Sequence, residues 1–340
     1  MKKIFNNLIF ILNSFTLSLL ILSYISPYIS PNIFWPISFL GLFFPILYLI
    51  NTLFLLYWIT NKKKQFLSNI IILLIGTQYI QNYIGLNPKT TNNETIKILT
   101  FNVRMFNTYD WIPNIKKDTI INYINQEDAD IICIQEFYED NKKPNLNYKF
   151  SHVGYRSDNN QLGLAIYSKF PQINKSNIII NNNNICIYSD IKIKKDTIRV
   201  YNMHLASNWF KQSDYSFINN PKKETVRDGV TGIIERMKIS YKKRADEAYV
   251  IRKNIEKSPY KIILCGDFND TPVSYSYRNI KKDLKDSFYI SGNGVGNSFV
   301  NIPALRIDYI MHDHSLNSFN YKKKDIILSD HYPISCEIEL

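Results

Sequence analysis

The sequence has few cysteines and little glycine or proline, and each shortage excludes a class of protein. Its 340 residues include 4 Cys, 11 Gly and 13 Pro. So few cysteines in so long a chain exclude a small fold held by disulfides, and none has the paired spacing of a zinc site. The low Gly and Pro content excludes collagen-like and low-complexity chains, and a hydrophobic fraction of 45% excludes a disordered one.

The cysteines themselves are predicted to be buried, unpaired thiols. Cys133, Cys186, Cys265 and Cys336 each lie within an apolar run. A free cysteine in such a run behaves as a small apolar side chain. We therefore expect these residues to pack in a core rather than to bind metal or carry out redox chemistry.

Acidic residues are missing from the first 86 positions, although the whole chain has 29 of them against 41 Lys and Arg. Three uncharged apolar stretches run from about residue 4 to 25, 37 to 59 and 66 to 84. Each is close to the roughly 20 residues that a helix needs to cross about 30 Å of hydrocarbon. The sequence therefore predicts three transmembrane helices, with residues 1–86 as a membrane anchor in the lipid bilayer.

The lysines of this anchor predict its orientation. Lys2 and Lys3 precede the first stretch, and Lys62–Lys64 separate the second from the third. Positive residues remain on the cytoplasmic side, so three crossings would place the rest of the chain outside the cytoplasmic membrane. The predicted localisation is a multi-pass protein of the cell (inner) membrane with an extracytoplasmic domain. No protein partner is predicted.

After a short polar linker at residues 87–95, the sequence takes on the character of an α/β domain that extends over residues 96–340. One helix is indicated between Ile234 and Ile255, where apolar residues recur at spacings of three and four. Many strands with few helices between them favour packed sheets flanked by helices. The strands are expected at residues 96–103, 130–136, 162–168, 185–193, 197–204, 261–266, 307–312 and 333–340.

Polar residues repeatedly close these apolar runs. They are Asn102, Glu136, His204, Asp267 with Asn269, Asp308, and Asp330 with His331. Charged groups placed where a buried strand emerges are costly for folding, and α/β proteins form their sites at strand ends. So many such endings in one domain predict a functional site.

The order of these motifs resembles that of the endonuclease/exonuclease/phosphatase superfamily. The matching segments are Thr100-Phe-Asn-Val103, Ile134-Gln-Glu136, Tyr201-Asn-Met-His204, Gly266-Asp-Phe-Asn269, Arg306-Ile-Asp-Tyr-Ile310 and Ser329-Asp-His-Tyr-Pro333. That superfamily includes deoxyribonucleases, apurinic endonucleases, bacterial sphingomyelinases and inositol-polyphosphate phosphatases. The resemblance covers about residues 96–340. It implies a four-layer α/β sandwich, in which two mixed β-sheets lie face to face and helices flank them.

The resemblance also implies a divalent metal ion. Hydrolysis of a phosphate ester needs an in-line water and neutralised phosphoryl oxygens, and Mg²⁺ is typically held by one or two carboxylates and several waters. Glu136 is the expected direct ligand of Mg²⁺ (or Mn²⁺). Asn102 and Asp330 are expected near the ion.

The remaining motif residues are expected to act on protons and on the phosphate. His331 is the candidate base or phosphate-polarising group, and Asp308 would orient its imidazole. Asp267 and Asn269 would position the attacking water and a non-bridging oxygen. His204 would donate a proton to the leaving group, since its ordinary pKa lies near neutrality.

Two positions depart from the repair endonucleases of this superfamily. Those enzymes carry an Asp where this chain has Arg104, and a Tyr where it has His204. The histidine is similar to the deoxyribonuclease and sphingomyelinase branches, which makes an enzyme of abasic-site repair a poor match. Arg156, Lys169 and Arg306 are candidates for phosphate contact, with a surface role equally open.

Three functions stay open on the sequence. The leading one is a membrane-anchored, metal-dependent phosphoesterase that hydrolyses a phosphodiester or phosphomonoester, such as a lipid head group or another envelope phosphate ester. The second is a membrane-tethered, non-specific nuclease, although no continuous basic stripe is evident. The third is a non-catalytic binding module, which would gain stability by losing the strand-end carboxylates.

Overall fold

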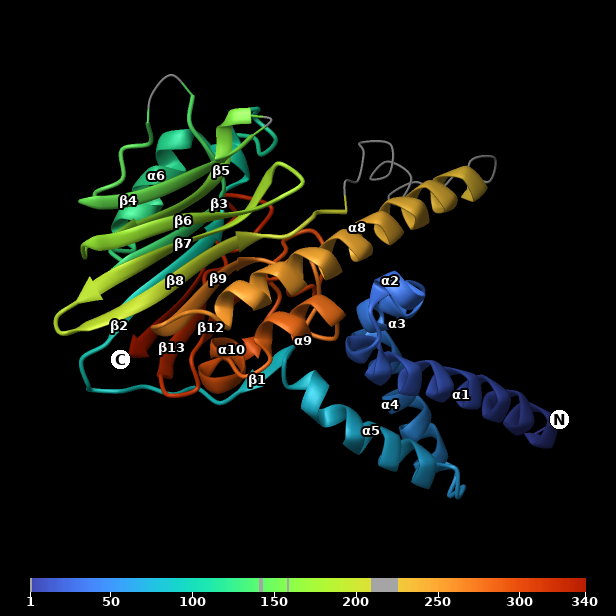
Figure 1. The fold of residues 1–340 in the computed structure, drawn as a ribbon. Helices are drawn as coiled ribbons and strands as arrows, with labels where there is room; N and C mark the ends of the chain where they lie inside the picture. Colours follow the sequence, from blue (N-terminus) through green and yellow to red (C-terminus); the bar gives the residue numbers. More distant parts are fainter. Residues whose placement is uncertain (1, 141–142, 158, 209–225) are drawn as a thin grey trace. The chain divides into compact units, whose positions relative to one another are not determined.

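A computed structural model describes residues 2–140, 143–157, 159–208 and 226–340 (Figure 1). The chain forms two compact units. The first, here called the helical unit, consists of Met1–Gln81, Ser207–Asp246 and Asp270–Arg278. The second, the sheet unit, consists of Asn82–Ala206, Glu247–Asn269 and Asn279–Leu340. The predicted division into residues 1–86, 87–95 and 96–340 stays a prediction.

The helical unit contains the apolar N-terminal segment. Its elements are α1 (Lys2–Ile25), η1 (Ser26–Tyr28), α2 (Pro31–Phe34), α3 (Ile37–Leu42), α4 (Phe44–Thr60), α5 (Phe66–Ile80) and the first part of α8 (Val226–Ile255). Prolines lie in the first turns of several helices of this unit. Pro31 occupies the first turn of α2 behind the N-cap Ser30, and Pro45 lies in the first turn of α4.

Fewer helices than predicted are long and apolar enough to span a membrane. Among the described residues, one helical stretch, Ile4–Tyr28, is long and apolar enough to cross a membrane, with a mean hydropathy of 2.1. The second predicted stretch is broken at Phe43, which leaves α4 with 17 residues, and α5 has 15. At 1.5 Å per residue these helices are about 26 Å and about 23 Å long, short of about 30 Å of hydrocarbon. The prediction of three such helices is therefore wrong.

The sheet unit is built from two mixed sheets of six strands each within the described residues. The first sheet has the order β13-β14-β2-β3-β5-β4, and the second sheet has the order β10-β12-β9-β8-β7-β6. The strands of the first are β2 (Ile96–Asn102), β3 (Ile131–Tyr138), β4 (Phe150–Arg156), β5 (Asn159–Ser168), β13 (Asn317–Lys323) and β14 (Ile334–Glu339). Those of the second are β6 (Gln172–Ile180), β7 (Asn183–Ile193), β8 (Asp196–His204), β9 (Lys261–Asp267), β10 (Lys285–Asp286) and β12 (Asp308–His312).

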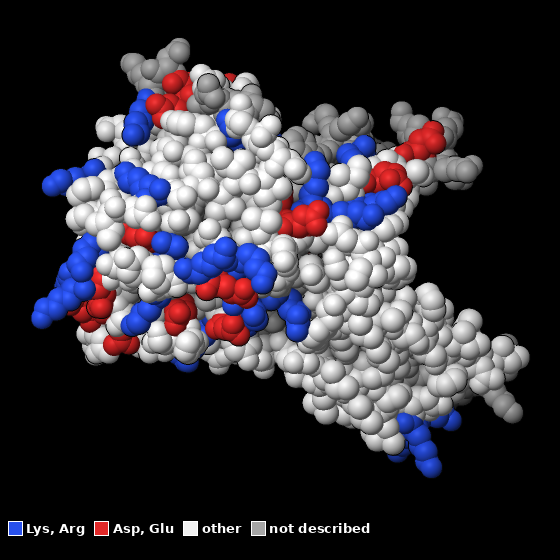
Figure 2. All heavy atoms as spheres, viewed as in Figure 1, with Lys and Arg blue, Asp and Glu red and all other residues white. Residues whose placement is uncertain are grey.

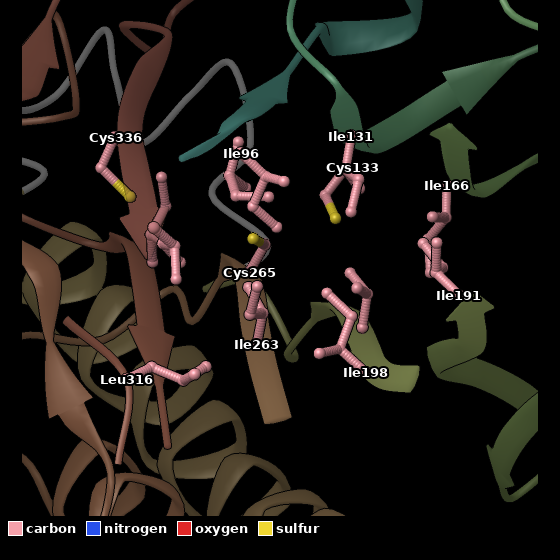
Figure 3. Packing of buried hydrophobic residues seen from close by; sticks show 14 of the residues in the cluster. Ile96, Ile131, Cys133, Ile166, Ile191, Ile198, Ile263, Cys265, Leu316 and Cys336 are labelled. Carbon is pink, nitrogen blue, oxygen red and sulfur yellow. The ribbon is translucent and has the colours of Figure 1, made fainter. Parts of the chain in front are cut away.

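A core of small and branched apolar side chains fills the space between the sheets (Figure 3). Ile131 and Ile166 come from the first sheet, and Ile191 and Ile263 from the second. The alternation of side chains along each strand directs one set of residues into this layer. All four cysteines are free and buried, which confirms the prediction from their apolar surroundings.

Helices cover the outer faces of the sheets. On the first sheet, α6 (Lys117–Gln126) buries Ile120, Ile121 and Ile124 in a second cluster that includes Leu99 and Ile132. On the second sheet, the Tyr201 hydroxyl of β8 donates to the Asn254 side chain of α8 at 2.9 Å. Short elements complete the unit: α9 (Tyr275–Lys281), which continues from the helical unit, α10 (Ser287–Ser291), η2 (Arg104–Asn107), and β1 (Ile84–Leu86) paired with β11 (Asn293–Val295). The predicted α/β class with two mixed sheets and helices is confirmed.

Two parallel strand pairs determine where the polar strand ends meet. β2 runs parallel to β3 in the first sheet, and β8 runs parallel to β9 in the second. The carboxyl ends of parallel strands lie at the same edge of a sheet, where α/β proteins place their sites. β12 is antiparallel to β9, so its first residue, Asp308, also reaches this edge, opposite Asp267.

Candidate active site

The first sheet contributes Asn102 and Glu136. Asn102 is the last residue of β2 and pairs in register with Gln135 of β3. The pairing of β3 with β5 shifts between Ile134 and Phe137, and Glu136 has a φ of 49° at this irregularity. A bulge of this kind redirects a side chain out of the regular alternation. It leaves the Glu136 carboxylate partly accessible, with a side-chain exposure of 27%.

The second sheet contributes a row of three residues across adjacent strands. His204 pairs with Asp267 between β8 and β9, and Asp267 pairs with Asp308 between β9 and β12. Gly266 has a φ of 149°, and a Cβ there would lie 2.2 Å from the Met203 carbonyl oxygen. Glycine is therefore required in this motif, because the two strands approach too closely for a side chain.

Asn102 links the two sheets at the site. Its Nδ2 donates to Glu136 Oε1 at 3.2 Å and to Asp267 Oδ2 at 3.0 Å. His204 Nε2 lies 3.9 Å from the same Glu136 oxygen and 3.6 Å from the same Asp267 oxygen. Two carboxylates, an amide and an imidazole therefore converge from β2, β3, β8 and β9.

His331 completes the cluster from the segment before β14. Its Nδ1 donates to Asp308 Oδ2 at 2.8 Å, and its Nε2 lies 3.6 Å from Asp267 Oδ2. Burial by itself lowers the pKa of His331, but the carboxylates of Asp308 and Asp267 outweigh it and raise that pKa well above its usual range. The backbone of Asp308 is held by the Ser298 hydroxyl, which accepts its N–H at 2.9 Å. The imidazole is thus fixed in orientation and electrostatically favoured in its charged form.

Asn269 and Asp330 lie beside this cluster with contacts of their own. The backbone N–H of Asn269 donates to Asp267 Oδ1 at 2.7 Å, and its side-chain amide donates to the Leu205 carbonyl at 3.0 Å. Asp330 Oδ2 lies 3.4 Å from Arg104 Nε, and its Oδ1 accepts from the Ser329 hydroxyl. Among the described residues, the Asp330 carboxylate therefore contacts Arg104 and Ser329, and it interacts electrostatically with His331.

The donor set fits a hard divalent cation. Glu136 Oε1 and Asp267 Oδ2 both lie within hydrogen-bond distance of one amide nitrogen, so two like charges stand close together. Oxygen ligands of this kind suit Mg²⁺ or Mn²⁺, and a bound cation would offset their repulsion. Within the described part of the chain, Asp267, Asp308 and His331 also form a group whose ligand atoms lie within 4.8 Å of one another. In that group, however, the Asp308 and His331 atoms nearest each other already form a hydrogen bond.

Two polar residues below the site had no predicted role. Gln135 Nε2 donates to the Asn202 side chain across the two sheets at 2.6 Å, and Asn202 Nδ2 donates to the Ile134 carbonyl at 2.8 Å. Both side chains are fully buried. This bridge fixes β3 against β8 next to Glu136. Its signal in the sequence was a polar residue inside each of two apolar runs.

The structure places the three cations predicted to bind phosphate in different environments. Lys169 pairs with Asp128 and Asp130, which precede β3 at the end opposite Glu136. Arg306 is fully buried and pairs with Asp286, so it is a structural residue of the core. Arg156 is the last residue of β4. Arg104 stands where the repair endonucleases carry an Asp. In the structure its guanidinium contacts Asp330 of the site.

The model of the endonuclease/exonuclease/phosphatase family matches residues 99–331, and the model of a domain of unknown function matches residues 6–83. The first match covers more than half of the chain, and the chain belongs to the endonuclease/exonuclease/phosphatase family. Members of this family are hydrolases that act on phosphate esters. No curated protein matched the sequence.

Solved structures share the fold at low sequence identity. The catalytic domain of human Nocturnin with a bound sulfate anion is 17% identical with a TM-score of 0.52, and the match covers 72% of this chain and 95% of that one. An endonuclease/exonuclease/phosphatase family protein from Bacteroides thetaiotaomicron is 18% identical with a TM-score of 0.52, covering 72% and 95%. A mannosyl-6-phosphatase from the same organism is 16% identical with a TM-score of 0.51, covering 72% and 100%. At this identity the similarities show the fold alone.

Proposed function

We propose that this chain is a membrane-anchored phosphoesterase that depends on a divalent metal ion. The observation that carries the proposal is the convergence of Asn102, Glu136, His204 and Asp267 beside the hydrogen-bonded pair of Asp308 and His331. Buried hydrogen bonds join Asn102 to Asp267 and His331 to Asp308. An assembly of carboxylates and imidazoles of this kind costs folding free energy, which a catalytic role would explain.

In this proposal Glu136 is the direct ligand of Mg²⁺ or Mn²⁺, and Asn102 and Asp330 lie near the ion. When bound, the ion would neutralise the phosphoryl oxygens and favour ionisation of a water. His331 offers Nε2 to the phosphate or to the attacking water, while its Nδ1 is held by Asp308. Asp267 accepts the Asn269 N–H and stands between the two imidazoles.

His204 takes the leaving-group role in this division of work. Its imidazole is partly exposed, with a side-chain exposure of 22%, whereas that of His331 is 6%. A proton donor to a departing alkoxide must reach the bulky part of the substrate, so the more accessible imidazole suits that task. Its Nε2 faces the carboxylates of Asp267, at 3.6 Å, and Glu136, at 3.9 Å.

The substrate is proposed to be a phosphate ester near the membrane, such as a lipid head group or another envelope phosphate ester. Anchoring of the chain favours a substrate at the bilayer surface. On the face shown in Figure 2, Lys and Arg of the sheet unit are interspersed with Asp and Glu. Nucleic-acid binding favours a continuous basic surface, so a tethered nuclease is the second choice.

Membrane anchoring rests on the apolar outer surface of α1, α4 and α5. Large hydrophobic side chains on all of these helices are exposed, and Figure 2 shows this surface almost free of charge. They include Ile11, Phe15, Leu22, Leu49, Leu53, Leu56, Ile71, Leu74 and Ile75. A water-soluble protein rarely leaves so large an apolar surface uncovered. In the proposal α1 spans the bilayer, and α4 and α5 share its apolar surroundings.

The interior of the same helices contains a cluster of hydrogen-bonded asparagines, which supports this environment. Asn13 Nδ2 donates to Asn51 at 3.2 Å and to Asn69 at 3.1 Å, and Asn13 Oδ1 accepts from Trp58 Nε1 at 2.7 Å. All of these residues are buried. Asparagine hydrogen bonds between helices, with apolar side chains facing outward, are typical of helices packed in lipid. In water the opposite arrangement would be expected.

Lysine substitutions on α1 provide a test of the anchor. Phe15 and Leu22 are 63% and 42% exposed, so the double variant Phe15→Lys/Leu22→Lys disturbs no internal packing. A lysine at the centre of a spanning helix costs about 3 kcal/mol, so we expect the variant to be released from membranes by alkaline carbonate, while the parent chain is retained. Ile173→Lys, at an exposed position of β6, is the matched control and should stay with the membrane. Retention of the α1 variant would contradict the proposed anchor.

The orientation follows from the lysines that precede α1. With Lys2 and Lys3 in the cytoplasm, a spanning α1 carries the rest of the chain to the other side. A reporter enzyme fused after Leu340 that requires the extracytoplasmic compartment should therefore be active. Activity of a cytoplasm-specific reporter at the same position would reverse the proposed orientation.

The activity itself is tested with the purified full-length chain in detergent. Phospholipid vesicles, sugar phosphates and DNA are offered with Mg²⁺ or Mn²⁺, and phosphate or head-group release is measured. We expect hydrolysis that EDTA abolishes and that added metal restores. Asp308→Asn is the control for contaminating enzymes, because it removes the negative charge that faces His331 Nδ1 and should be inactive. Absence of metal-dependent hydrolysis of every substrate would favour a binding module, and hydrolysis confined to DNA would favour the nuclease.

A further inference from the structure

The segment between β2 and α6 is built on an unusual backbone. Arg104, Met105, Phe106 and Asn107 all have positive φ values, between 44° and 54°. A non-glycine residue in this conformation costs about 1 kcal/mol or more, and such residues persist where the surroundings hold them. Here Phe106 is fully buried against Phe137, with ring centroids 5.7 Å apart. Strain held in this way next to a site indicates that the side-chain positions it creates are used.

The strained backbone places Arg104 against the site. Its N–H donates to Asn102 Oδ1 at 3.0 Å, and its Nε lies 3.4 Å from Asp330 Oδ2. The guanidinium also lies over the Trp111 ring, 4.7 Å from its centroid. The side chain is 30% exposed, and within the described part of the chain neither Nη atom has a hydrogen-bond partner. An ion pair and an aromatic face thus orient the guanidinium while its Nη donors stay available.

The charge of the site makes these donors important. Glu136, Asp267, Asp308 and Asp330 all carry carboxylates, which repel an anionic substrate. Arg104 offsets one of them and brings a planar set of donors that can bind two phosphate oxygens at once. A phosphate monoester has three non-bridging oxygens and a second negative charge near neutral pH, whereas a diester has two such oxygens and one charge. A guanidinium beside the site therefore stabilises a monoester more than a diester.

We propose that Arg104 determines substrate specificity by binding a non-bridging oxygen of the substrate, so that the site selects phosphate monoesters over diesters. The inference rests on the proposed phosphoesterase function and narrows its substrate class. Trp111 and Asp330 are positioning residues in this arrangement, because they orient the guanidinium.

Two substrates with the same leaving group isolate the effect. 4-Nitrophenyl phosphate is a monoester, and methyl 4-nitrophenyl phosphate is the corresponding diester. The full-length chain in detergent is assayed at saturating Mg²⁺, and the ratio of kcat/KM for monoester over diester is measured. We expect Arg104→Met to lower this ratio about 10- to 100-fold, the range for loss of a hydrogen bond to a charged group. The ratio for Arg104→Lys should lie between those of the parent chain and Arg104→Met, because lysine keeps the charge but lacks the planar pair of donors.

Lys194→Met is the control. Lys194 lies between β7 and β8, is 66% exposed and pairs with the exposed Glu94, so its loss should leave the ratio unchanged. An equal loss on both substrates in Arg104→Met would overturn the inference, since Arg104 would then act through Asp330 alone. A parent chain that prefers the diester would overturn it as well.

Phosphate binding separates this inference from the proposed function. Titration calorimetry compares inorganic phosphate with dimethyl phosphate, with Mg²⁺ present. The parent chain should bind inorganic phosphate more tightly, and Arg104→Met should lose that preference. A parent chain that binds phosphate in this way but hydrolyses nothing would leave the inference standing and refute the proposed function. Equal binding of both ions by the parent chain would refute the inference.

Discussion

Glu136→Gln is expected to lower turnover about 1,000-fold or more and to weaken the response to Mg²⁺. The carboxylate is the proposed direct metal ligand, and its position at the bulge within β3 makes it accessible. Metal ions contribute several kcal/mol of charge stabilisation in the transition state, and each 1.4 kcal/mol is about tenfold in rate. Glutamine keeps the shape and the hydrogen-bonding oxygen, so the fold should be preserved. The measurement is initial rate against Mg²⁺ concentration.

Glu139→Gln is the matched control for this change. Glu139 lies just after β3 and accepts a hydrogen bond from the Tyr155 hydroxyl, away from the site contacts. Its loss should leave both turnover and the metal titration unchanged. If Glu136→Gln kept full activity with an unaltered titration, the ion would have to be held elsewhere. The group formed by Asp267, Asp308 and His331 would then be the next candidate.

His204→Ala and His331→Ala are each expected to lower turnover about 100-fold or more, as loss of a general acid or base does. The two variants should differ in their response to the leaving group. A nitrophenyl leaving group needs little protonation, so it should restore much of the rate of His204→Ala. His331, held by Asp308 and close to Asp267, acts on the phosphate or the attacking water, which every substrate requires. His331→Ala should therefore stay slow.

The measurement is turnover of each variant on an alkyl and a nitrophenyl ester of phosphate. His314→Ala serves as the control, because His314 is 78% exposed and lies outside the site. Equal restoration of both variants, or restoration of neither, would show that the division of roles between the two histidines is wrong. The family membership would be unaffected by that result.

The sequence by itself determined the central strands and the long helix. Apolar runs at residues 185–193, 197–204 and 261–266 correspond to β7, β8 and β9, and the apolar spacing between Ile234 and Ile255 lies within α8. The three strands are buried along most of their length, and α8 is buried along one face, so their hydrophobic patterns are strong. The outer strands β4, β6 and β13 had no such signal. They lie at sheet edges and are half exposed, which leaves their residues mixed in character.

Composition also overestimated the number of helices that are long enough to span a membrane. The run at residues 37–59 is apolar throughout, but the structure divides it at Phe43, next to Gly41 and Pro45. An apolar run indicates that a segment avoids water. It does not determine whether a single helix continues through the whole segment. Backbone breaks at proline and glycine decide that. The polar interior formed by Asn13, Asn51 and Asn69 was equally invisible, because these residues are far apart in sequence.

The residue types of the candidate site were evident from the motifs, whereas their assembly depended on strand direction. Asn102, His204 and Asp267 end strands of the two parallel pairs, and Glu136 lies at the bulge within β3. Asp308 instead begins β12, and His331 precedes β14; both reach the site because those strands run antiparallel to β9 and β2. Arg104 was identified as a departure, and only the folded chain places its guanidinium beside Asp330 and Trp111. Local patterns encode which residues form a strand, but the pairing direction depends on contacts between segments far apart in the chain, and those are decided when the sheets pack.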